Sequence, residues 1–351
     1  MSDRTSRRPV RSARAVLALA LVSAAMLVLT ACRGGATFSN PIKAVGADPY
    51  VVEWHSAFYL IESRDGGLWV TRSPKDDLTG IASGTAKKIW TSPVEGPDCT
   101  AVWAPELHLV DGRWYVYYAA TTCDDDNANH RMFALVSKTD DPQGTFEDAG
   151  KVADAADRWA IDGTRVVWHG VAYFVWSGWP GRTDGRQNLY IARTSSPTRL
   201  VGSGVMLATA TRPFERYGAP ILEGPQSLVH DGVLRIVYSA SGSWTDHYGY
   251  GMLTATSDDL LDPATWRKSP KSVFASDEAV TSPGHGSFVK SPDGTEDWMV
   301  YHSAQYKGAG WDRQIDAQRF TWAANGAPSF GQPIGDDVDQ PLPSGQRSAG
   351  G

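Results

Sequence analysis

Hydrophobic and polar residues alternate with a period of two over short stretches of the chain, which is typical of β-strands. Long stretches with the spacing of an amphipathic helix are scarce. Five stretches share one plan, with a polar or small opening, a strand, a tight turn such as Asp-Gly, and a second strand rich in aromatic residues. They are residues 47–61, 103–119, 161–178, 223–240 and 284–302.

These five stretches recur at a nearly constant interval. Their openings are separated by 55, 59, 61 and 62 residues when they are marked by Asp48, Trp103, Asp162, Glu223 and His285. Such a recurrence, with several strands in each unit, predicts propeller blades. We therefore expect an all-β fold over residues 38–335, a five-bladed β-propeller with four-stranded antiparallel blades. Its core would be divided among blades that surround a central channel.

The two ends of the chain do not share this pattern. Five arginines within residues 4–14 precede an apolar run over residues 15–29, which indicates an export signal rather than a membrane span. The run ends in "LTAC", which resembles the lipobox of bacterial lipoproteins and implies that residues 1–31 are removed and that Cys32 is lipidated. The alternative is an ordinary secretory signal, and both interpretations place the mature protein outside the cytoplasm. We expect the polar, proline-rich residues 336–351 to be a disordered tail.

The charge of the mature chain excludes some classes of partner. Residues 1–31 hold five arginines and one aspartate, so the 33 basic and 39 acidic residues of the whole chain become 28 and 38, a formal charge of −10. No basic stripe remains, which argues against nucleic acid, and an acidic surface repels acidic polymers such as pectate. The 14 tryptophans and 13 tyrosines favour a neutral carbohydrate, although core packing accounts for most of them. We expect a monomer that contacts a membrane only through its lipid anchor.

Besides Cys32, the mature chain has two cysteines, Cys99 and Cys123. In an oxidising compartment we expect them to form a disulfide between the loops that flank residues 103–121. The alternative is a metal-binding thiol pair, but neither a CxxC spacing nor a nearby histidine cluster supports it. The acidic segment 123–127 lacks the spacing of a calcium-binding EF-hand, so we interpret it as a solvated loop.

Three of the five openings carry a carboxylate, namely Asp48, Asp162 and Glu223. Because the innermost strands of all blades line one channel, we expect these side chains to converge near one of its ends. Two carboxylates on opposite sides of a glycosidic bond are the usual means of cleaving it. Taken singly, Asp48 and Asp162 could equally be turn residues.

The local sequence suggests a different role for each carboxylate. Glu223 follows two apolar residues and precedes Gly-Pro, so desolvation should raise its pKa and suit it to act as an acid. Asp162, if it lies close by, would raise that pKa further by like-charge repulsion. Asp48 has a more polar sequence environment and should stay ionised, as a general base must.

These motifs resemble glycoside hydrolase family 43, whose members are five-bladed propellers that act on arabinans and xylans. The similarity runs through nearly the whole mature chain, in "ADPYV" around Asp48, "WAPE" at 103–106, "IDG" around Asp162, "EGP" at 223–225 and "GHGS" at 284–287. The resemblance implies an inverting mechanism in which Asp48 is the general base and Glu223 the general acid. Asp162 would orient the acid and tune its pKa, and no cofactor would be required.

The resemblance also suggests roles for residues outside the three acids. His285 would contact a structural calcium ion through waters, or else be a structural histidine, since calcium prefers oxygen ligands. Arg313 resembles a family arginine that reaches the bound sugar, and the alternative is a surface salt bridge. Trp103 would form a wall of the sugar subsite unless it packs in the core. Trp176 and Trp179, expected in a loop after the third repeat, could shape the subsites for the leaving group.

The resemblance narrows the choice of substrate. No additional β-sandwich domain is evident, which argues against a β-xylosidase, and "WSGWPG" at 176–181 and "RQIDAQ" at 313–318 resemble exo-acting α-L-arabinofuranosidases. We therefore expect the release of terminal arabinofuranose, with an α-1,5 linkage, from plant cell-wall arabinan, arabinoxylan or their oligosaccharides. The alternatives within the family are an endo-arabinanase or a β-xylosidase. A non-catalytic carbohydrate-binding propeller is the alternative from another class, and the presence of all three acids argues against it.

Overall fold

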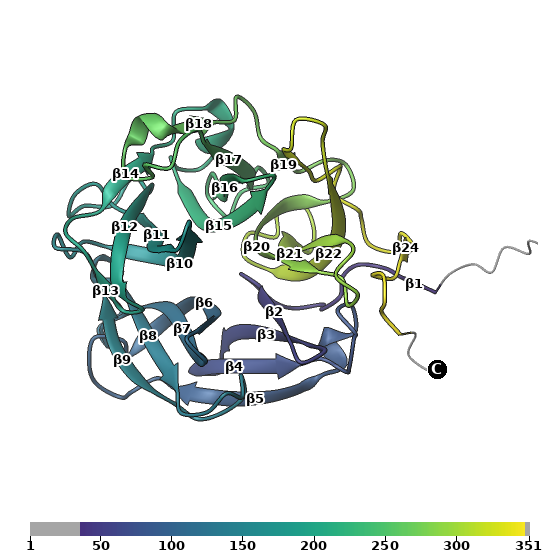
Figure 1. The fold of residues 1–351 in the computed structure, drawn as a ribbon, viewed down its shortest axis with the longest axis horizontal. Helices are drawn as coiled ribbons and strands as arrows, with labels where there is room; N and C mark the ends of the chain where they lie inside the picture. Colours follow the sequence, from purple (N-terminus) through teal and green to yellow (C-terminus); the bar gives the residue numbers. More distant parts are fainter. Residues whose placement is uncertain (1–35, 348–351) are drawn as a thin grey trace, which may run out of the picture. The chain divides into compact units, whose positions relative to one another are not determined.

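The computed structural model describes residues 36–347, which form five antiparallel β-sheets arranged in a ring (Figure 1). The prediction of an all-β, five-bladed propeller is confirmed. The predicted export signal and Cys32 lie outside the described residues, so cleavage and lipidation stay predictions. Among residues 36–347, no helix has the length and apolar character needed to cross a membrane.

Each sheet is built from strands that follow one another along the chain. The first sheet comprises β2 (Tyr50–Trp54), β3 (Ala57–Arg64), β4 (Gly67–Arg72) and β5 (Thr85–Thr91). The second comprises β6 (Thr100–Val110), β7 (Arg113–Thr121), β8 (Arg131–Ser137) and β9 (Phe146–Val152). The third comprises β10 (Ala160–Trp168), β11 (Val171–Gly178), β12 (Asn188–Ser196), β13 (Arg199–Leu200) and β14 (Val205–Ala208).

The fourth and fifth sheets complete the ring. The fourth comprises β15 (Leu222–His230), β16 (Val233–Ala240), β17 (Gly249–Ala255), β18 (Trp266–Lys268) and β19 (Phe274–Ala275). The fifth comprises β20 (Thr281–Lys290), β21 (Asp297–Ala304), β22 (Arg313–Trp322) and β23 (Pro328–Ser329). Four short 3₁₀-helices lie in the connections, at Ile81–Ser83, Asn127–Asn129, Pro213–Glu215 and Pro263–Thr265.

The third and fourth sheets depart from the predicted four strands. In the third sheet both β13 and β14 pair with β12, and in the fourth both β18 and β19 pair with β17. The outer edge of each of these sheets is therefore covered by two short strands instead of one. The innermost strands, β2, β6, β10, β15 and β20, contact their neighbours around the channel (Figure 1).

Tight turns join the first and second strands of four sheets. The turns at 55–56, 111–112, 169–170 and 231–232 each have two residues, and both residues have positive φ. This conformation matches the right-handed twist of an antiparallel hairpin, and it favours Asp-Gly and similar pairs. The Asp-Gly and His-Gly pairs in the sequence therefore mark real hairpins.

The hydrophobic core is divided among the interfaces between neighbouring sheets. Five buried clusters are present among the described residues, and each joins two adjacent sheets. The cluster that closes the ring packs Val51 and Leu60 of the first sheet against Val300 of the fifth. Burial of these apolar side chains holds the first and last sheets together, and backbone hydrogen bonds between Lys43, which precedes the first sheet, and Ile315 of β22 add to this closure.

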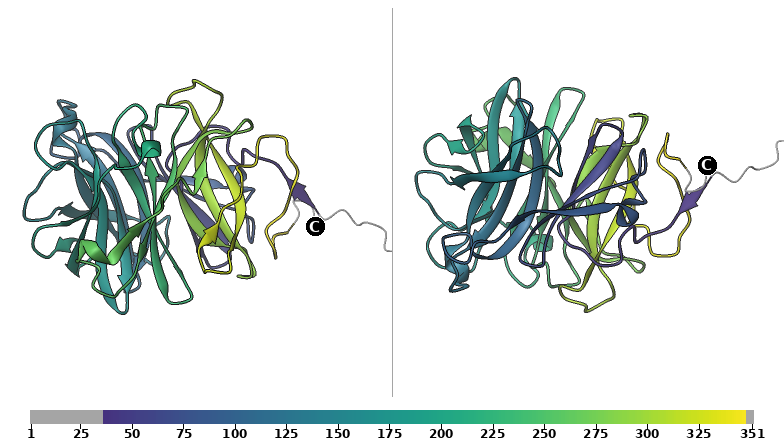
Figure 2. Two further views of the ribbon diagram at one scale, coloured as in Figure 1. Left: turned by 90° about the horizontal axis from the view of Figure 1, so that it is seen from above. Right: turned by 90° about the horizontal axis from the view of Figure 1, so that it is seen from below.

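The prediction of a disordered tail is wrong for residues 336–347. Strand β24 (Gln340–Pro341) pairs with β1 (Thr37–Phe38) on the outer side of the fifth sheet (Figures 1 and 2). Farther along, the Gln346 side chain accepts hydrogen bonds from the backbone N–H groups of Leu78 (3.0 Å) and Thr79 (3.3 Å). Composition alone suggested disorder, but these contacts with the first sheet hold the segment in place.

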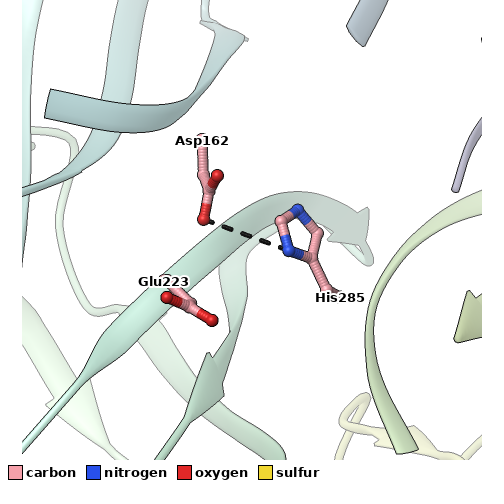
Figure 3. Close-up of side chains that lie close together, drawn as sticks. All are labelled: Asp162, Glu223 and His285. Atoms are coloured by element: carbon pink, nitrogen blue, oxygen red, sulfur yellow. Dashed lines mark ion pairs between the residues drawn. The ribbon is translucent and has the colours of Figure 1, made fainter. Parts of the chain in front are cut away.

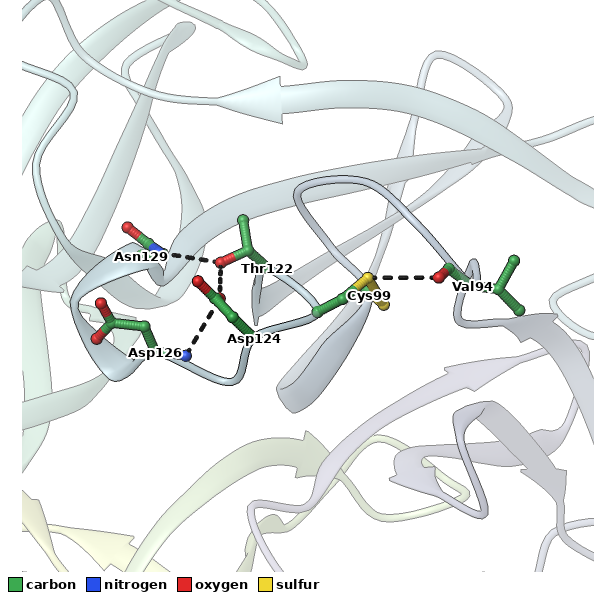
Figure 4. Close-up of a disulfide and its surroundings, with 7 residues drawn as sticks. Val94, Cys99, Thr122, Asp124, Asp126 and Asn129 are labelled. Atoms are coloured by element: carbon green, nitrogen blue, oxygen red, sulfur yellow. Dashed lines mark hydrogen bonds between the residues drawn. A yellow bond between two sulfur atoms is a disulfide. The ribbon is translucent and has the colours of Figure 1, made fainter.

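The predicted disulfide between Cys99 and Cys123 is present (Figure 4). It joins the segment before β6 to the loop after β7, as expected. The acidic loop that follows is held by its own side chains, since Thr122 Oγ1 donates to Asp124 Oδ1 at 2.5 Å and Asn129 donates to Thr122 Oγ1 at 3.0 Å. Residues 124–126 are exposed, which agrees with the interpretation of a solvated loop.

Candidate active site

Irregular strand starts direct side chains into one end of the channel. In β6, β10, β15 and β20 the pairing with the next strand shifts close to the N-terminal end, which marks β-bulges. Asp162 (φ 54°) and His285 (φ 35°) lie within two of these bulges, and Asp48 (φ 48°) lies just before β2. Bulges re-aim side chains and are frequent beside active sites.

Gly224, which follows Glu223, allows the backbone to pass close to the His285 ring. Its φ is 53°, and a Cβ at this position would lie 3.0 Å from the ring of His285. The backbone at Gly224 therefore approaches His285 as closely as a residue without a side chain allows. Its N–H donates to Asp162 Oδ2 at 3.0 Å. Asp162 thereby restrains the backbone immediately after Glu223.

The predicted convergence of residues from different repeats is found in the structure (Figure 3). Asp162, Glu223 and His285 each offer one ligand-type atom, and these atoms lie within 4.8 Å of one another. His285 Nδ1 lies 3.2 Å from Asp48 Oδ1 and 4.0 Å from Asp162 Oδ2. Four blades thus contribute to one polar cluster at the end of the channel.

Asp48 is surrounded by nitrogen atoms. Its Oδ1 lies 3.1 Å from Arg313 Nη1, 3.1 Å from His302 Nδ1 and 3.2 Å from His285 Nδ1. Burial alone would raise the pKa of Asp48, but the Arg313 guanidinium and the two histidines outweigh it and hold the pKa well below its usual range. Asp48 is therefore ionised at neutral pH, the state that a general base requires.

Glu223 has the opposite electrostatic environment. Burial, reinforced by the charge of Asp48, raises its pKa to about 7, although a hydrogen bond from the Tyr248 hydroxyl to Oε1 at 2.8 Å opposes this shift. Burial and the neighbouring Glu223 also raise the pKa of Asp162 well above its usual value. Two buried carboxyl groups this close favour retaining a proton. Glu223 is therefore suited to donate a proton near neutral pH.

Tyr248 and His302 belong to the site but were not predicted from the sequence. His302 is fully buried, and burial lowers its pKa to about 4, so it is neutral at pH 7. Its ring stacks on that of Tyr248 with centroids 5.6 Å apart and planes 11° apart. Tyr248 contacts Glu223 and His302 contacts Asp48, so the stacked rings connect the surroundings of the two carboxyl groups. Only the strand pairing that places His302 opposite Gly284 could have indicated it.

Arg313 lies in the centre of the site and is not part of a surface salt bridge. Its side chain is 17% exposed, and it contacts Asp48 from the first residue of β22. The surface alternative is therefore wrong, while contact with a bound sugar stays a prediction.

Trp103 is 38% exposed and stacks on the buried His130 with centroids 3.8 Å apart. Its ring is held in position while part of it faces solvent. This geometry is compatible with a wall of a sugar subsite, which stays a prediction.

Trp176 and Trp179 do not face a substrate as predicted, although Trp179 does lie in the expected loop. Trp176 lies within strand β11 and is 6% exposed, so it is not in a loop. Trp179 follows that strand, but it is 3% exposed and stacks on Trp159 with centroids 4.8 Å apart. Both belong to the hydrophobic cluster between the second and third sheets. Rings covered to this extent offer no face to a substrate.

A polar cavity lies along the innermost strands. It has a volume of about 130 Å³ and is lined by side chains that include Tyr50, His108 and Gln226. Glu106 accepts hydrogen bonds from His108 Nε2 (2.7 Å) and from Gln226. The Glu106 carboxylate beside the cavity and the hydroxyl and amide oxygens in its lining are ligands that a hydrated cation prefers, whereas the Arg165 guanidinium, which also lines the cavity, disfavours one.

Comparison with known proteins agrees with this geometry. Residues 38–328 match the family model described as glycosyl hydrolases family 43. The chain is 35% identical over 315 residues to an extracellular exo-α-(1→5)-L-arabinofuranosidase of Streptomyces avermitilis, a match that covers 86% of this chain and 65% of that protein. It is 32% identical over 277 residues to an enzyme of the same description from Streptomyces chartreusis, covering 78% and 84%.

A solved structure is also similar to this chain, and it too is of an α-L-arabinofuranosidase. The crystal structure of an α-L-arabinofuranosidase from Lactobacillus brevis superposes with a TM-score of 0.80 at 31% identity. The match covers 86% of this chain and 98% of that one.

Proposed function

The chain belongs to glycoside hydrolase family 43, and from this premise we propose that it is an exo-acting α-L-arabinofuranosidase. It releases terminal α-L-arabinofuranosyl residues from arabinan or arabino-oligosaccharides, with α-1,5 linkages as the preferred target. The names of the two Streptomyces relatives and of the Lactobacillus brevis structure support this substrate class. Since the match spans 65% of the first of these relatives, the activity is proposed for the propeller itself.

The observation that carries a hydrolytic role is the opposite pKa shift of two carboxyl groups in one site. Asp48 is held ionised by Arg313 and the histidines, whereas Glu223 has a pKa of about 7. An inverting glycosidase needs such a pair, one group to activate water and the other to protonate the departing oxygen.

We assign the steps of the reaction accordingly. Asp48 removes a proton from a water molecule, which attacks the anomeric carbon of the terminal sugar. The bond between that carbon and the glycosidic oxygen breaks, and Glu223 transfers its proton to the departing oxygen. Asp162 acts through Glu223, because it restrains the Gly224 N–H and disfavours a second negative charge nearby.

Proton NMR of arabino-oligosaccharide hydrolysis tests this proposal. We expect the wild-type protein to release single arabinose units, which appear first as the β-anomer, and Asp48→Ala and Glu223→Ala to lose this activity. A mixture of shorter oligosaccharides would favour the endo-arabinanase alternative. Cleavage of xylosides in place of arabinosides would favour the β-xylosidase, and binding without cleavage would favour a carbohydrate-binding propeller.

We further propose that the protein acts outside the cytoplasm, attached through a lipid on Cys32. The arginine-rich and apolar N-terminal sequence, the disulfide, and the extracellular description of the Streptomyces relatives support this location. Metabolic labelling with a radioactive fatty acid tests it. We expect label in the wild-type protein and none in Cys32→Ser, and equal labelling of both would contradict the assignment.

We also propose that the protein binds a calcium ion. Glu106 and Gln226 would hold a hydrated ion near His285, where it would contribute positive charge beneath the carboxylates. The protein is first treated with a chelator to remove bound metal, and isothermal titration calorimetry with calcium chloride then tests this assignment. We expect the wild-type protein to bind calcium and Glu106→Gln to lose this binding. Unchanged calcium binding in Glu106→Gln would exclude this position.

A further inference from the structure

Two loops at the active-site end of the propeller carry large aromatic side chains that the proposed reaction does not use. Residues 241–248 connect β16 to β17, and residues 305–312 connect β21 to β22. The strands β16 and β21 end opposite the first residues of the innermost strands β15 and β20. Both loops therefore lie at the end of the channel where the catalytic carboxyl groups gather.

Each loop presents one tryptophan to solvent. Trp244 is 43% exposed and Trp311 is 63% exposed. Their ring centroids are 5.9 Å apart and their planes are inclined by 71°, so the two rings form one continuous apolar surface from two different blades. We call this pair the Trp244–Trp311 platform. Exposed aromatic rings that adjoin a polar site commonly mark a binding surface.

Hydrogen bonds between the two loops hold the platform in shape. Trp311 Nε1 donates to Ser243 Oγ at 3.1 Å, and the Gly308 N–H donates to Asp246 Oδ1 at 2.8 Å. Beneath Trp244, a Cβ on Gly242 would lie only 2.7 Å from the indole ring. These contacts fix the positions of the two rings, so the rings are exposed although the loops that carry them are held in place.

The platform is connected directly to the catalytic groups. The loop with Trp244 ends at Tyr248, which donates its hydrogen bond to Glu223. The loop with Trp311 continues into Arg313, which contacts Asp48. Since a chain spans at most about 3.5 Å per residue, Trp244 lies within about 14 Å of Tyr248. A few sugar units can span a separation of at most this size.

We propose that the Trp244–Trp311 platform is the subsite for the leaving-group side of a neutral arabinan chain, an inference that rests on the proposed function. Glu223 protonates the oxygen of the leaving chain, so this chain departs along the side of the site where Glu223 lies. Trp244 belongs to the same blade as Glu223. The C–H faces of sugars stack on the indoles, while Ser243 and Asp246 can meet sugar hydroxyls.

The test compares substrates of different length. We expect Trp311→Ala and Trp244→Ala each to lower kcat/KM on arabinotetraose roughly tenfold, the scale of one lost aromatic stacking contact. For 4-nitrophenyl α-L-arabinofuranoside, which carries no sugar chain on the leaving side, kcat/KM should change by less than about twofold. The matched control is Trp69→Ala, because Trp69 lies on β4, under the Arg64 guanidinium (4.5 Å) and away from the channel.

Other outcomes would overturn the proposal. An equal loss on both substrates would mean that the tryptophans only support the fold, and an unchanged kcat/KM on arabinotetraose would mean that they do not contact the chain. If sedimentation shows a dimer that Trp311→Ala dissociates, the platform is an interface between copies of the protein. If the wild-type protein cleaves neither substrate, the proposed hydrolysis is wrong. Calorimetric titration of the wild-type protein and the two variants with arabinotetraose then tests whether the platform binds the sugar chain. Binding that is retained in Trp244→Ala and Trp311→Ala would exclude it, and binding lost in both would support it.

Discussion

The hydroxyl group of Tyr248 donates a hydrogen bond to Glu223 Oε1 at 2.8 Å. This bond stabilises the charged form of the carboxyl group and opposes the burial that raises its pKa to about 7. The ring of the same tyrosine stacks on His302, which contacts Asp48. One side chain therefore affects the acid directly and is packed against a partner of the base.

Replacement of Tyr248 by phenylalanine should shift the pH dependence of activity. Loss of the hydrogen bond raises the pKa of Glu223, which must be protonated to act, so the alkaline limb of kcat/KM moves to higher pH. The measurement is kcat/KM against pH, and Tyr115→Phe, on strand β7, is the control. An alkaline limb that stays in place would show that Tyr248 does not tune the acid.

The two catalytic roles can be separated by the leaving group. Glu223→Gln should lower kcat/KM on arabinobiose by about 10²–10⁴-fold, the usual contribution of general acid catalysis. Its loss on 4-nitrophenyl α-L-arabinofuranoside should be far smaller, because nitrophenolate departs without protonation. Asp48→Asn should lose activity on both substrates, since activation of water is needed in either case. The exposed Glu147→Gln serves as control, and equal losses by Glu223→Gln on both substrates would contradict the acid role.

Replacement of Arg313 by methionine should shift the acidic limb. The guanidinium lowers the pKa of Asp48, so its removal raises that pKa and moves the acidic limb of kcat/KM to higher pH. Arg319→Met on the same strand is the control, because Arg319 pairs with Glu296 (3.0 Å) and its side chain is 55% exposed. If only kcat/KM falls while the acidic limb stays in place, Arg313 serves substrate binding and does not set the ionisation of Asp48.

Gln346 should stabilise the closure of the ring. Besides accepting two backbone hydrogen bonds, its amide donates to Asp77 Oδ1 (2.7 Å) and Thr79 Oγ1 (2.6 Å). We expect Gln346→Ala to lower the free energy of unfolding by about 1 kcal/mol, because partly buried partners lose their hydrogen bonds. Chemical denaturation measures this, with the exposed Gln332→Ala as control. Equal stability of both variants would show that the tail does not contribute.

Several features of the active site could be predicted from local sequence alone. Asp48, Asp162, Glu223 and His285 open repeated units, and a closed ring brings equivalent positions of repeated units together. The apolar neighbours of Glu223 correctly indicated a raised pKa. By contrast, Trp176 and Trp179 were expected to face the substrate but are buried between blades, because the end of β11 and the residue after it pack against the second sheet.

The amino-acid pattern was enough to predict the paired strands and turn of each repeat, the number of blades and the convergence of the acids, because each follows from local periodicity and from repetition at a nearly constant interval. The residues that meet across blades could be identified only in the folded structure. Tyr248 with Glu223, His302 and Arg313 with Asp48, Trp244 with Trp311, and Gln346 with Thr79 are contacts between residues distant in sequence or in different loops. Such contacts depend on strand register, bulges and the closure of the ring, which no local pattern of residues encodes.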